Sequence, residues 1–132
     1  MTTSQADLDA FIHAVLNRIS GLSQPQIRRL PTSDVLQWVS SRTWPDWAAL
    51  PGLYFFELDD SLQYVGRALR SALRGRLSTQ CKSLQDPEWK KVVLNPRTSV
   101  GAVALPQVDW FWTAALEAAV IVKFQPRFSS RI

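Results

Sequence analysis

Residues 52–66 read GLYFFELDDSLQYVG, and this stretch carries the clearest sign of how the chain folds. Two short runs rich in aromatic and aliphatic side chains, residues 53–58 and 62–65, lie on either side of the polar residues 59–61. Aromatic and β-branched side chains favour strands, and a short polar segment containing aspartate between two such runs is typical of a hairpin turn. The stretch therefore predicts a β-hairpin.

Two helices are expected before this hairpin. Apolar residues recur at helical spacing over residues 5–20, with Ser4 as N-cap and Gly21 as stop, and a shorter helix is predicted over 33–41. Residues 1–50 are therefore interpreted as an N-terminal helical extension, separate from a domain over 51–132.

Helical and strand patterns also alternate after the hairpin. A helix is expected over 67–80, with an apolar stripe on one side and Arg67, Arg70 and Arg74 on the other. A loop is expected over 82–95. A strand over 98–105 and a largely buried helix over 106–124, which ends at a proline, complete the order. The expected order is therefore helix, helix, strand, strand, helix, strand and helix, and the expected fold class is α+β.

Composition narrows the class of protein. The 132 residues are 46% hydrophobic and 20% charged, which is ordinary for one globular domain and argues against disorder. One cysteine and one histidine argue against a structural zinc site. The polar N-terminus and the lack of a long apolar run predict a cytoplasmic protein that does not enter a membrane.

Positive charge is concentrated in the second part of the chain. The net charge is +4, and residues 51–132 hold eleven Lys and Arg against seven Asp and Glu, whereas residues 1–50 balance to zero. An excess of basic residues steers an anionic partner by long-range electrostatics. The distribution therefore favours nucleic acid as the partner of residues 51–132.

Glu117 is the sole acidic residue between residues 110 and 132, and it interrupts an otherwise apolar helical run. A carboxylate on a buried helix is unfavourable unless a cation or strong donors compensate it. Three readings stay open from the pattern alone: a metal ligand, the partner of a helix-face arginine, or a side chain turned to solvent.

The hairpin and this helix carry a longer resemblance. Gly52-Leu53-Tyr54 and, ten residues on, Tyr64-Val65-Gly66 resemble the paired motif of the GIY-YIG nuclease superfamily. Arg74 stands ten residues after Tyr64, where the family has a catalytic arginine, and Glu117 precedes an aliphatic run and Pro126 as in the family's closing motif. The resemblance implies a small three-stranded antiparallel sheet flanked by helices.

The resemblance also implies a chemistry. Relatives cut DNA with a divalent cation, so Glu117 is expected to bind Mg²⁺ or Mn²⁺, which prefer oxygen ligands and retain waters. Arg74 is expected to stabilise phosphate charge in the transition state, and Tyr54 and Tyr64 to lie near the attacking water. Arg67 is expected to bind a phosphate, and Arg70 and Arg76 are further candidates for nucleic-acid contacts.

Two positions depart from the family pattern. Ser78 stands four residues after Arg74, where many relatives have histidine or tyrosine, and Ser129 stands three residues after Pro126, where asparagine is common. The sequence therefore predicts a metal-dependent DNA endonuclease, in repair, restriction or mobile-element biology, with a catalytically weakened nucleic-acid-binding module as the alternative. A homodimer, or a protein partner held by residues 1–50, is also kept open, because one site cuts one strand at a time.

Overall fold

The computed structural model describes residues 4–22 and 25–128. Its elements, in chain order, are α1 (Gln5–Ser20), β1 (Arg28–Pro31), α2 (Thr32–Ser41), the 3-10 helix η1 (Asp46–Ala49), β2 (Gly52–Leu58), β3 (Ser61–Ala68), α3 (Leu73–Lys82), α4 (Pro87–Leu94), β4 (Ser99–Ala104) and α5 (Trp110–Phe124). None of the helices in these ranges is long and apolar enough to cross a membrane.

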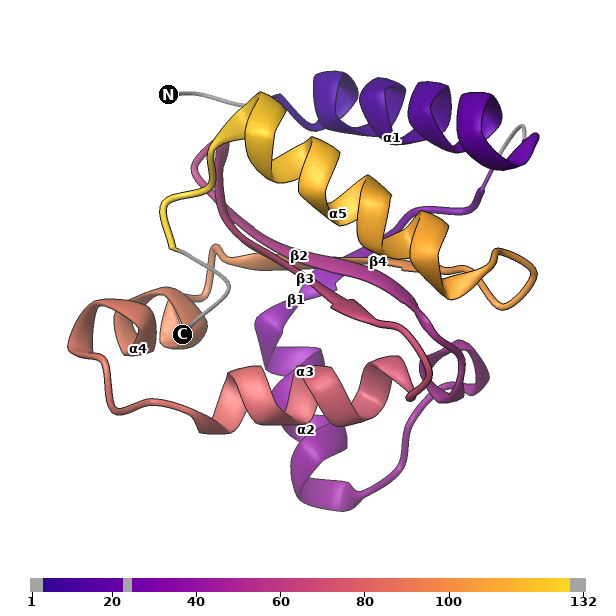
Figure 1. Ribbon diagram of the computed structural model, residues 1–132. Coiled ribbons are helices and arrows are strands. Elements are labelled where there is room, and N and C mark those ends of the chain that lie inside the picture. Colours follow the sequence, from indigo (N-terminus) through magenta and orange to yellow (C-terminus); the bar gives the residue numbers. More distant parts are fainter. Residues whose placement is uncertain (1–3, 23–24, 129–132) are drawn as a thin grey trace.

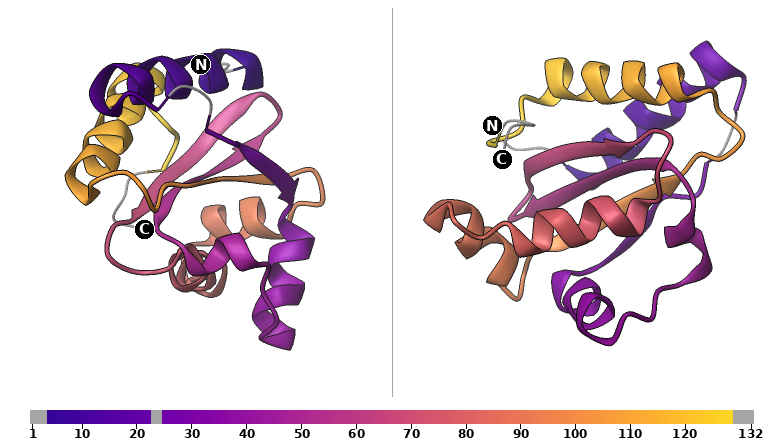
Figure 2. Two further views of the ribbon diagram at one scale, coloured as in Figure 1. Left: turned by 90° about the vertical axis from the view of Figure 1, so that its right-hand side faces the viewer. Right: turned by 60° about the horizontal axis from the view of Figure 1, so that its bottom comes forward.

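A four-stranded antiparallel sheet forms the middle layer, with strand order β1-β4-β2-β3. Helices α1 and α5 cover one face, and α2, α3 and α4 cover the other (Figure 1). The turned views in Figure 2 show the same three layers. The expected α+β fold with helices on both sides of an antiparallel sheet is thus confirmed.

Each face of the sheet has its own hydrophobic core. Leu53, Phe55 and Val65 point toward α1 and α5, whereas Tyr54, Phe56 and Tyr64 point toward α3 and α4. This split follows from the strand geometry, because successive side chains point to opposite faces. Since both faces are covered, β2 is apolar without alternation from Gly52 to Phe56.

The β2–β3 hairpin confirms the prediction from residues 52–66. Asp59 and Asp60 both have positive φ, as a type I′ turn requires, and aspartate tolerates this conformation better than most residues. Gly52 and Gly66 are required by close packing. A Cβ at Gly52 would overlap with the Val103 carbonyl on β4, and one at Gly66 would overlap with the ring of Tyr54.

The expectation of three strands is wrong, because β1 pairs with β4 and forms a fourth. The segment Arg28–Pro31 is short, carries two arginines and ends in proline, so it has no alternating apolar pattern. Its pairing partner lies some seventy residues further along the chain. Proline is tolerated there because β1 is an edge strand.

Residues 1–50 pack closely against the remainder of the chain. Leu8, Ile12 and Leu16 of α1 are fully buried in the core beneath α5. Arg29 of β1 forms ion pairs with Asp9 of α1 (2.7 Å) and Glu57 of β2 (2.8 Å), which joins three elements. The division into an extension and a domain at residue 50 stays a prediction, and these contacts favour one folding unit.

Three tryptophans of residues 1–50 also face the core. Trp38 lies next to Trp44 and Trp47, with ring centroids 5.7 and 6.0 Å apart, and all three are partly buried against the α3 side of the sheet. Their side chains therefore serve packing first, which leaves little of their surface for a protein partner.

Three helices differ from expectation, and the last of them, α5, begins at Trp110 rather than at residue 106. Strand β3 continues to Ala68 and α3 begins only at Leu73, so the expected start at residue 67 is too early. Residues 87–94, expected to be loop, form α4. Asp86 caps α4 by accepting hydrogen bonds from the Glu88 and Trp89 amides, and Pro87 occupies its first turn, which are both helix-start signals.

Candidate active site

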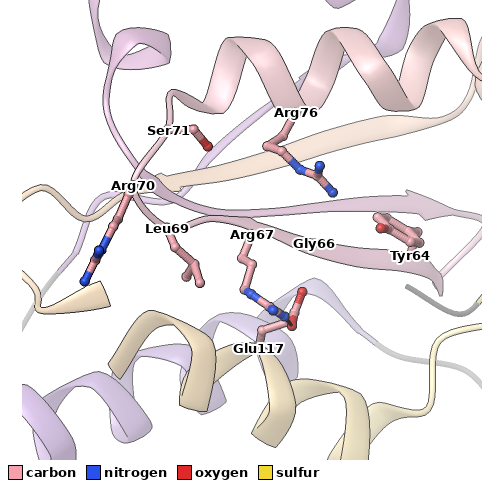
Figure 3. A pocket seen from close by; sticks show the side chains of 8 residues that line it. All are labelled: Tyr64, Gly66, Arg67, Leu69, Arg70, Ser71, Arg76 and Glu117. Atoms are coloured by element: carbon pink, nitrogen blue, oxygen red, sulfur yellow. Dashed lines mark hydrogen bonds and ion pairs between the residues drawn. The ribbon is translucent and has the colours of Figure 1, made fainter. Parts of the chain in front are cut away.

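A cavity of about 490 Å³ opens at the edge strand β3, between α3 on one side and α5 on the other (Figure 3). Its volume lies in the range usual for ligand sites. We call it the edge cavity. It is lined by Tyr64, Gly66, Arg67, Leu69, Arg70, Ser71, Arg76 and Glu117.

Glu117 enters the edge cavity from α5. The residue is 5% exposed, and its carboxylate forms an ion pair with the Arg67 guanidinium of β3. Arg67 itself is much more exposed, with 43% of its side chain accessible. The buried carboxylate thus has one cationic partner within the described part of the chain, and that partner reaches the cavity from solvent.

The carboxylate of Glu117 suits a hard divalent cation. Mg²⁺ is commonly held by one or two carboxylates, with waters and substrate phosphate completing its shell. No cluster of three or more His, Cys, Asp or Glu exists within residues 4–22 and 25–128. A cation here would therefore depend on Glu117, water and an anionic substrate.

Arg76 enters the edge cavity from α3, on the opposite side of β3 from Glu117 (Figure 3). It is partly buried, and its Nε is inaccessible to solvent and has no hydrogen-bond partner among the described residues. An unpaired buried donor of this kind is unusual, since most buried polar groups are satisfied. Because Arg76 lines the cavity and forms no ion pair with any described residue, its guanidinium can donate to an anion bound there.

Arg74, the expected catalytic arginine, does not line the edge cavity and is exposed. The reason is the late start of α3. Leu73 and Leu77 bury one helix face, and Arg74 and Arg76 flank that face on opposite sides, about 160° apart around the helix. The side that carries Arg76 borders the edge cavity. The loop of residues 69–72 delays the helix and shifts the inward position by two residues.

Tyr54 and Tyr64 lie side by side on β2 and β3, with ring centroids 6.0 Å apart. Tyr64 lines the edge cavity, and its hydroxyl accepts a hydrogen bond from Gln80 Nε2 (3.1 Å). The Tyr54 hydroxyl is buried beneath Gly66, without a partner in the part of the chain that the structure describes. The two expected tyrosines are thus adjacent, with one lining the cavity.

Burial raises the pKa of both tyrosines, and the positive charge of Arg76 opposes that shift. A phenol held above its usual pKa stays protonated at neutral pH. Tyr64 can therefore donate and accept hydrogen bonds in the cavity, but it is not a ready base by itself.

The remaining expected nucleic-acid contacts lie at the mouth of the cavity. Arg67 and Arg70 both line it and are exposed, and Arg70 also stacks on the Trp110 ring at 5.1 Å.

The sequence did not single out Gln80 as a site residue. Gln80 stands four residues after Arg76, which is the same spacing as that between Arg74 and Ser78. Ser129 lies outside the described residues.

No family model matches the chain, and no curated protein matches it in sequence. Solved structures do. The GIY-YIG N-terminal endonuclease domain of UvrC from Thermotoga maritima, bound to magnesium, matches with a TM-score of 0.52 and 18% identity over 71% of this chain and 93% of that one. Two point mutants of that domain, bound to its catalytic divalent cation, match with TM-scores of 0.52 and 0.51, at 18% and 19% identity, over 71% of this chain and 92% of theirs.

The chain has the GIY-YIG fold. The resemblance carried by Gly52, Tyr54, Tyr64 and Gly66 is thereby confirmed at the level of the fold. In this GIY-YIG fold the two motifs pair as neighbouring strands, since Tyr54 lies opposite Gly66 in the β2–β3 register. At this identity the likeness establishes the fold alone, and activity depends on the side chains of the edge cavity.

Proposed function

We propose that the chain is a divalent-cation-dependent endonuclease that hydrolyses phosphodiester bonds in DNA at the edge cavity. The observation that carries the proposal is the pair formed by Arg76 and Glu117, which reach one cavity from opposite sides of β3. Hydrolysis of a phosphodiester needs positive charge where negative charge grows and a held, oriented water. The Arg76 guanidinium supplies hydrogen-bond donors for the phosphate, and the Glu117 carboxylate supplies a ligand for the cation.

The charge of the edge cavity supports an anionic substrate. Among the described residues, three arginines, Arg67, Arg70 and Arg76, line it against one carboxylate, Glu117, so this part of the lining carries a net charge of +2. Positive potential in a partly enclosed cleft attracts phosphate and raises its local concentration. The excess of basic residues in 51–132 acts in the same direction.

Each side chain has a role in this proposal. Glu117 would hold Mg²⁺ or Mn²⁺; when bound, the cation neutralises phosphate charge and makes water more acidic. Arg76 donates to the non-bridging phosphate oxygens as their charge grows. Tyr64, held by Gln80, orients the attacking water by hydrogen bonding, and Tyr54 packs beside the Tyr64 ring.

Arg67 has a double role. It compensates the buried Glu117 carboxylate and is exposed enough to leave it. With a cation held by Glu117, the Arg67 guanidinium would be free to bind a backbone phosphate at the cavity mouth. Arg70, further along the same rim, would bind a neighbouring phosphate.

The alternative is a nucleic-acid-binding module of the same fold with weak or no catalysis. Ser78 and Gln80 favour it, because neither of the two positions that correspond to the family's histidine or tyrosine carries a side chain that can move a proton at neutral pH. This alternative predicts salt-dependent DNA binding that needs no metal and is weakened in Arg76→Ala.

Cleavage of a DNA panel tests the proposal. Purified protein is incubated with supercoiled, branched and single-stranded DNA in Mg²⁺, in Mn²⁺ and in EDTA, beside Glu117→Ala. We expect nicking that requires the cation and disappears in Glu117→Ala. No cleavage under any condition, or equal cleavage by Glu117→Ala, would overturn the proposal, and preference for branched DNA would favour a role in repair over restriction.

A further inference from the structure

Three consecutive aromatic residues at the start of α5 are exposed. Trp110, Phe111 and Trp112 have accessible fractions of 44%, 45% and 37%. We call them the aromatic cluster. Aromatic side chains of this size are normally buried, and adjacent exposed ones mark interaction surfaces more often than isolated ones do. The cluster is therefore a candidate for contact with a ligand.

The aromatic cluster is continuous with the edge cavity. A shallow groove of about 320 Å³ is lined by Leu69, Arg70 and Trp110, and both Leu69 and Arg70 also line the edge cavity. The Arg70 guanidinium lies over the Trp110 ring at 5.1 Å. The groove thus combines an apolar aromatic face with a positive charge, the two features that a nucleotide base and its phosphate require.

The helix sets the distance between groove and cavity. Trp110 and Glu117 are seven residues apart on α5, which places them on one side of the helix about 10 Å from each other. Successive nucleotides of a stacked strand rise by about 3.4 Å. A strand whose phosphate lies at Glu117 therefore brings a base about three nucleotides away to Trp110.

We propose that Trp110 stacks on an unpaired base of the DNA strand being cut, while Arg70 binds the adjacent phosphate. This inference rests on the proposed function, because DNA is taken as the ligand. A base inside a duplex has both faces covered by its neighbours, so only an unpaired or terminal base can offer a face to Trp110. The substrate class is then DNA with single-stranded nucleotides beside the scissile phosphate, such as a flap, a junction or a single strand.

The contact between Trp110 and an unpaired base is tested by measuring DNA binding under conditions that prevent cleavage. Anisotropy of labelled single-stranded and duplex oligonucleotides of equal length is measured in EDTA at several salt concentrations. Trp110→Ala is expected to raise the Kd for single strands about tenfold, with duplex Kd within about twofold and an unchanged salt slope, because stacking is lost and phosphate contacts remain. Val122→Ala, on the same helix and 76% exposed, is the matched control and should alter neither Kd.

An oligonucleotide that lacks bases at successive positions near the scissile phosphate gives a second, independent readout. The wild-type protein should bind it about tenfold more weakly than the normal strand, and Trp110→Ala should bind both equally. Equal affinity of wild type and Trp110→Ala for normal single strands, or equal losses on single strands and duplex, would overturn the proposal.

The outcomes separate this inference from the proposed activity. Binding that depends on Trp110 without cleavage in Mg²⁺ refutes the nuclease and retains the base-stacking site. Cleavage in Mg²⁺, together with binding that Trp110→Ala leaves unchanged, supports the nuclease and refutes the base-stacking site. A protein that binds no oligonucleotide but sediments as a dimer, which Trp110→Ala dissociates, would replace DNA by a second copy of the chain as the occupant of the groove.

Discussion

Arg67 on β3 and Glu117 on α5 form an ion pair across the edge cavity, so the proposed metal ligand is already occupied by a cation of the chain itself. The pair joins the edge of the sheet to the helix that covers it. Because the carboxylate is 5% exposed, it needs a positive partner whether or not a metal is bound. Arg67 thus fills the place that we assign to the cation.

Competition between Arg67 and a metal predicts the effect of removing the arginine. Arg67→Ala should bind Mn²⁺ about two- to fivefold more tightly in the absence of DNA, since the ion pair is partly exposed and is worth at most about 1 kcal/mol. Titration calorimetry measures this, with Arg70→Ala as control. Weaker Mn²⁺ binding by Arg67→Ala would mean that the arginine supports the metal site.

The two motif tyrosines should respond differently to loss of the hydroxyl. Tyr64→Phe leaves the buried Gln80 amide without its acceptor and should lower the free energy of unfolding by about 1 kcal/mol. Tyr54→Phe removes a buried hydroxyl that has no partner among the described residues and should be neutral or stabilising. Urea denaturation distinguishes the two. An equal loss in both would show that a water satisfies Tyr54.

Residues 1–50 should contribute to the stability of the whole chain. Arg29→Ala leaves Glu57, which is 5% exposed, without its positive partner and should lower the free energy of unfolding by about 2–4 kcal/mol. Arg28→Ala is the matched control. It removes a stacking contact with Trp47 and should lower the free energy of unfolding by less than about 1 kcal/mol. If Arg29→Ala unfolds like the wild type, the N-terminal segment is only loosely attached.

Alkaline pH should destabilise the fold through three buried acids. Burial raises the pKa of the Cys81 thiol to about 12 from 9.0, and raises that of Tyr54 and Tyr64 as well. Above pH 9 the unfolded chain loses these protons before the native state does. The unfolded chain then holds fewer protons than the native state, so the free energy of unfolding falls as pH rises. The loss begins near pH 9 and continues to about pH 12.

Thermal unfolding between pH 7 and pH 11 measures this fall. In Cys81→Ala the decline should begin about one pH unit later, where tyrosine ionises in the unfolded chain. A profile for Cys81→Ala that coincides in shape with the wild type would show that the thiol takes no part. Stability that rises between pH 9 and pH 11 would contradict the sign of all three shifts.

Some of this structure could be predicted from local sequence. The hairpin follows from two apolar runs around Asp59 and Asp60, and Glu117 is conspicuous as an acid in an apolar helix. Both signals lie within single elements. The α4 helix also had a local signal in Asp86-Pro87, which the proline-punctuated surroundings obscured.

Other features depend on distant parts of the chain. Strand β1 exists because β4 offers an unpaired edge, and nothing in residues 28–31 themselves indicates a strand. The position of α3 depends on how far β3 extends: α3 begins at Leu73, six residues later than expected, and the side of the helix that carries Arg76 borders the cavity. Counting from Tyr64 along the sequence cannot include that displacement.

Arg76 and Glu117 reach the edge cavity from opposite sides of β3, and we propose that this pair carries out cleavage. Single-turnover cleavage in Mg²⁺, compared for Arg76→Ala and Arg74→Ala, tests it most directly, because both replace an arginine on one helix. We expect Arg76→Ala to be slower by about 100-fold or more and Arg74→Ala to stay within about threefold of the wild type. Normal cleavage by Arg76→Ala with loss in Arg74→Ala would show that Arg74, and not Arg76, is the catalytic arginine.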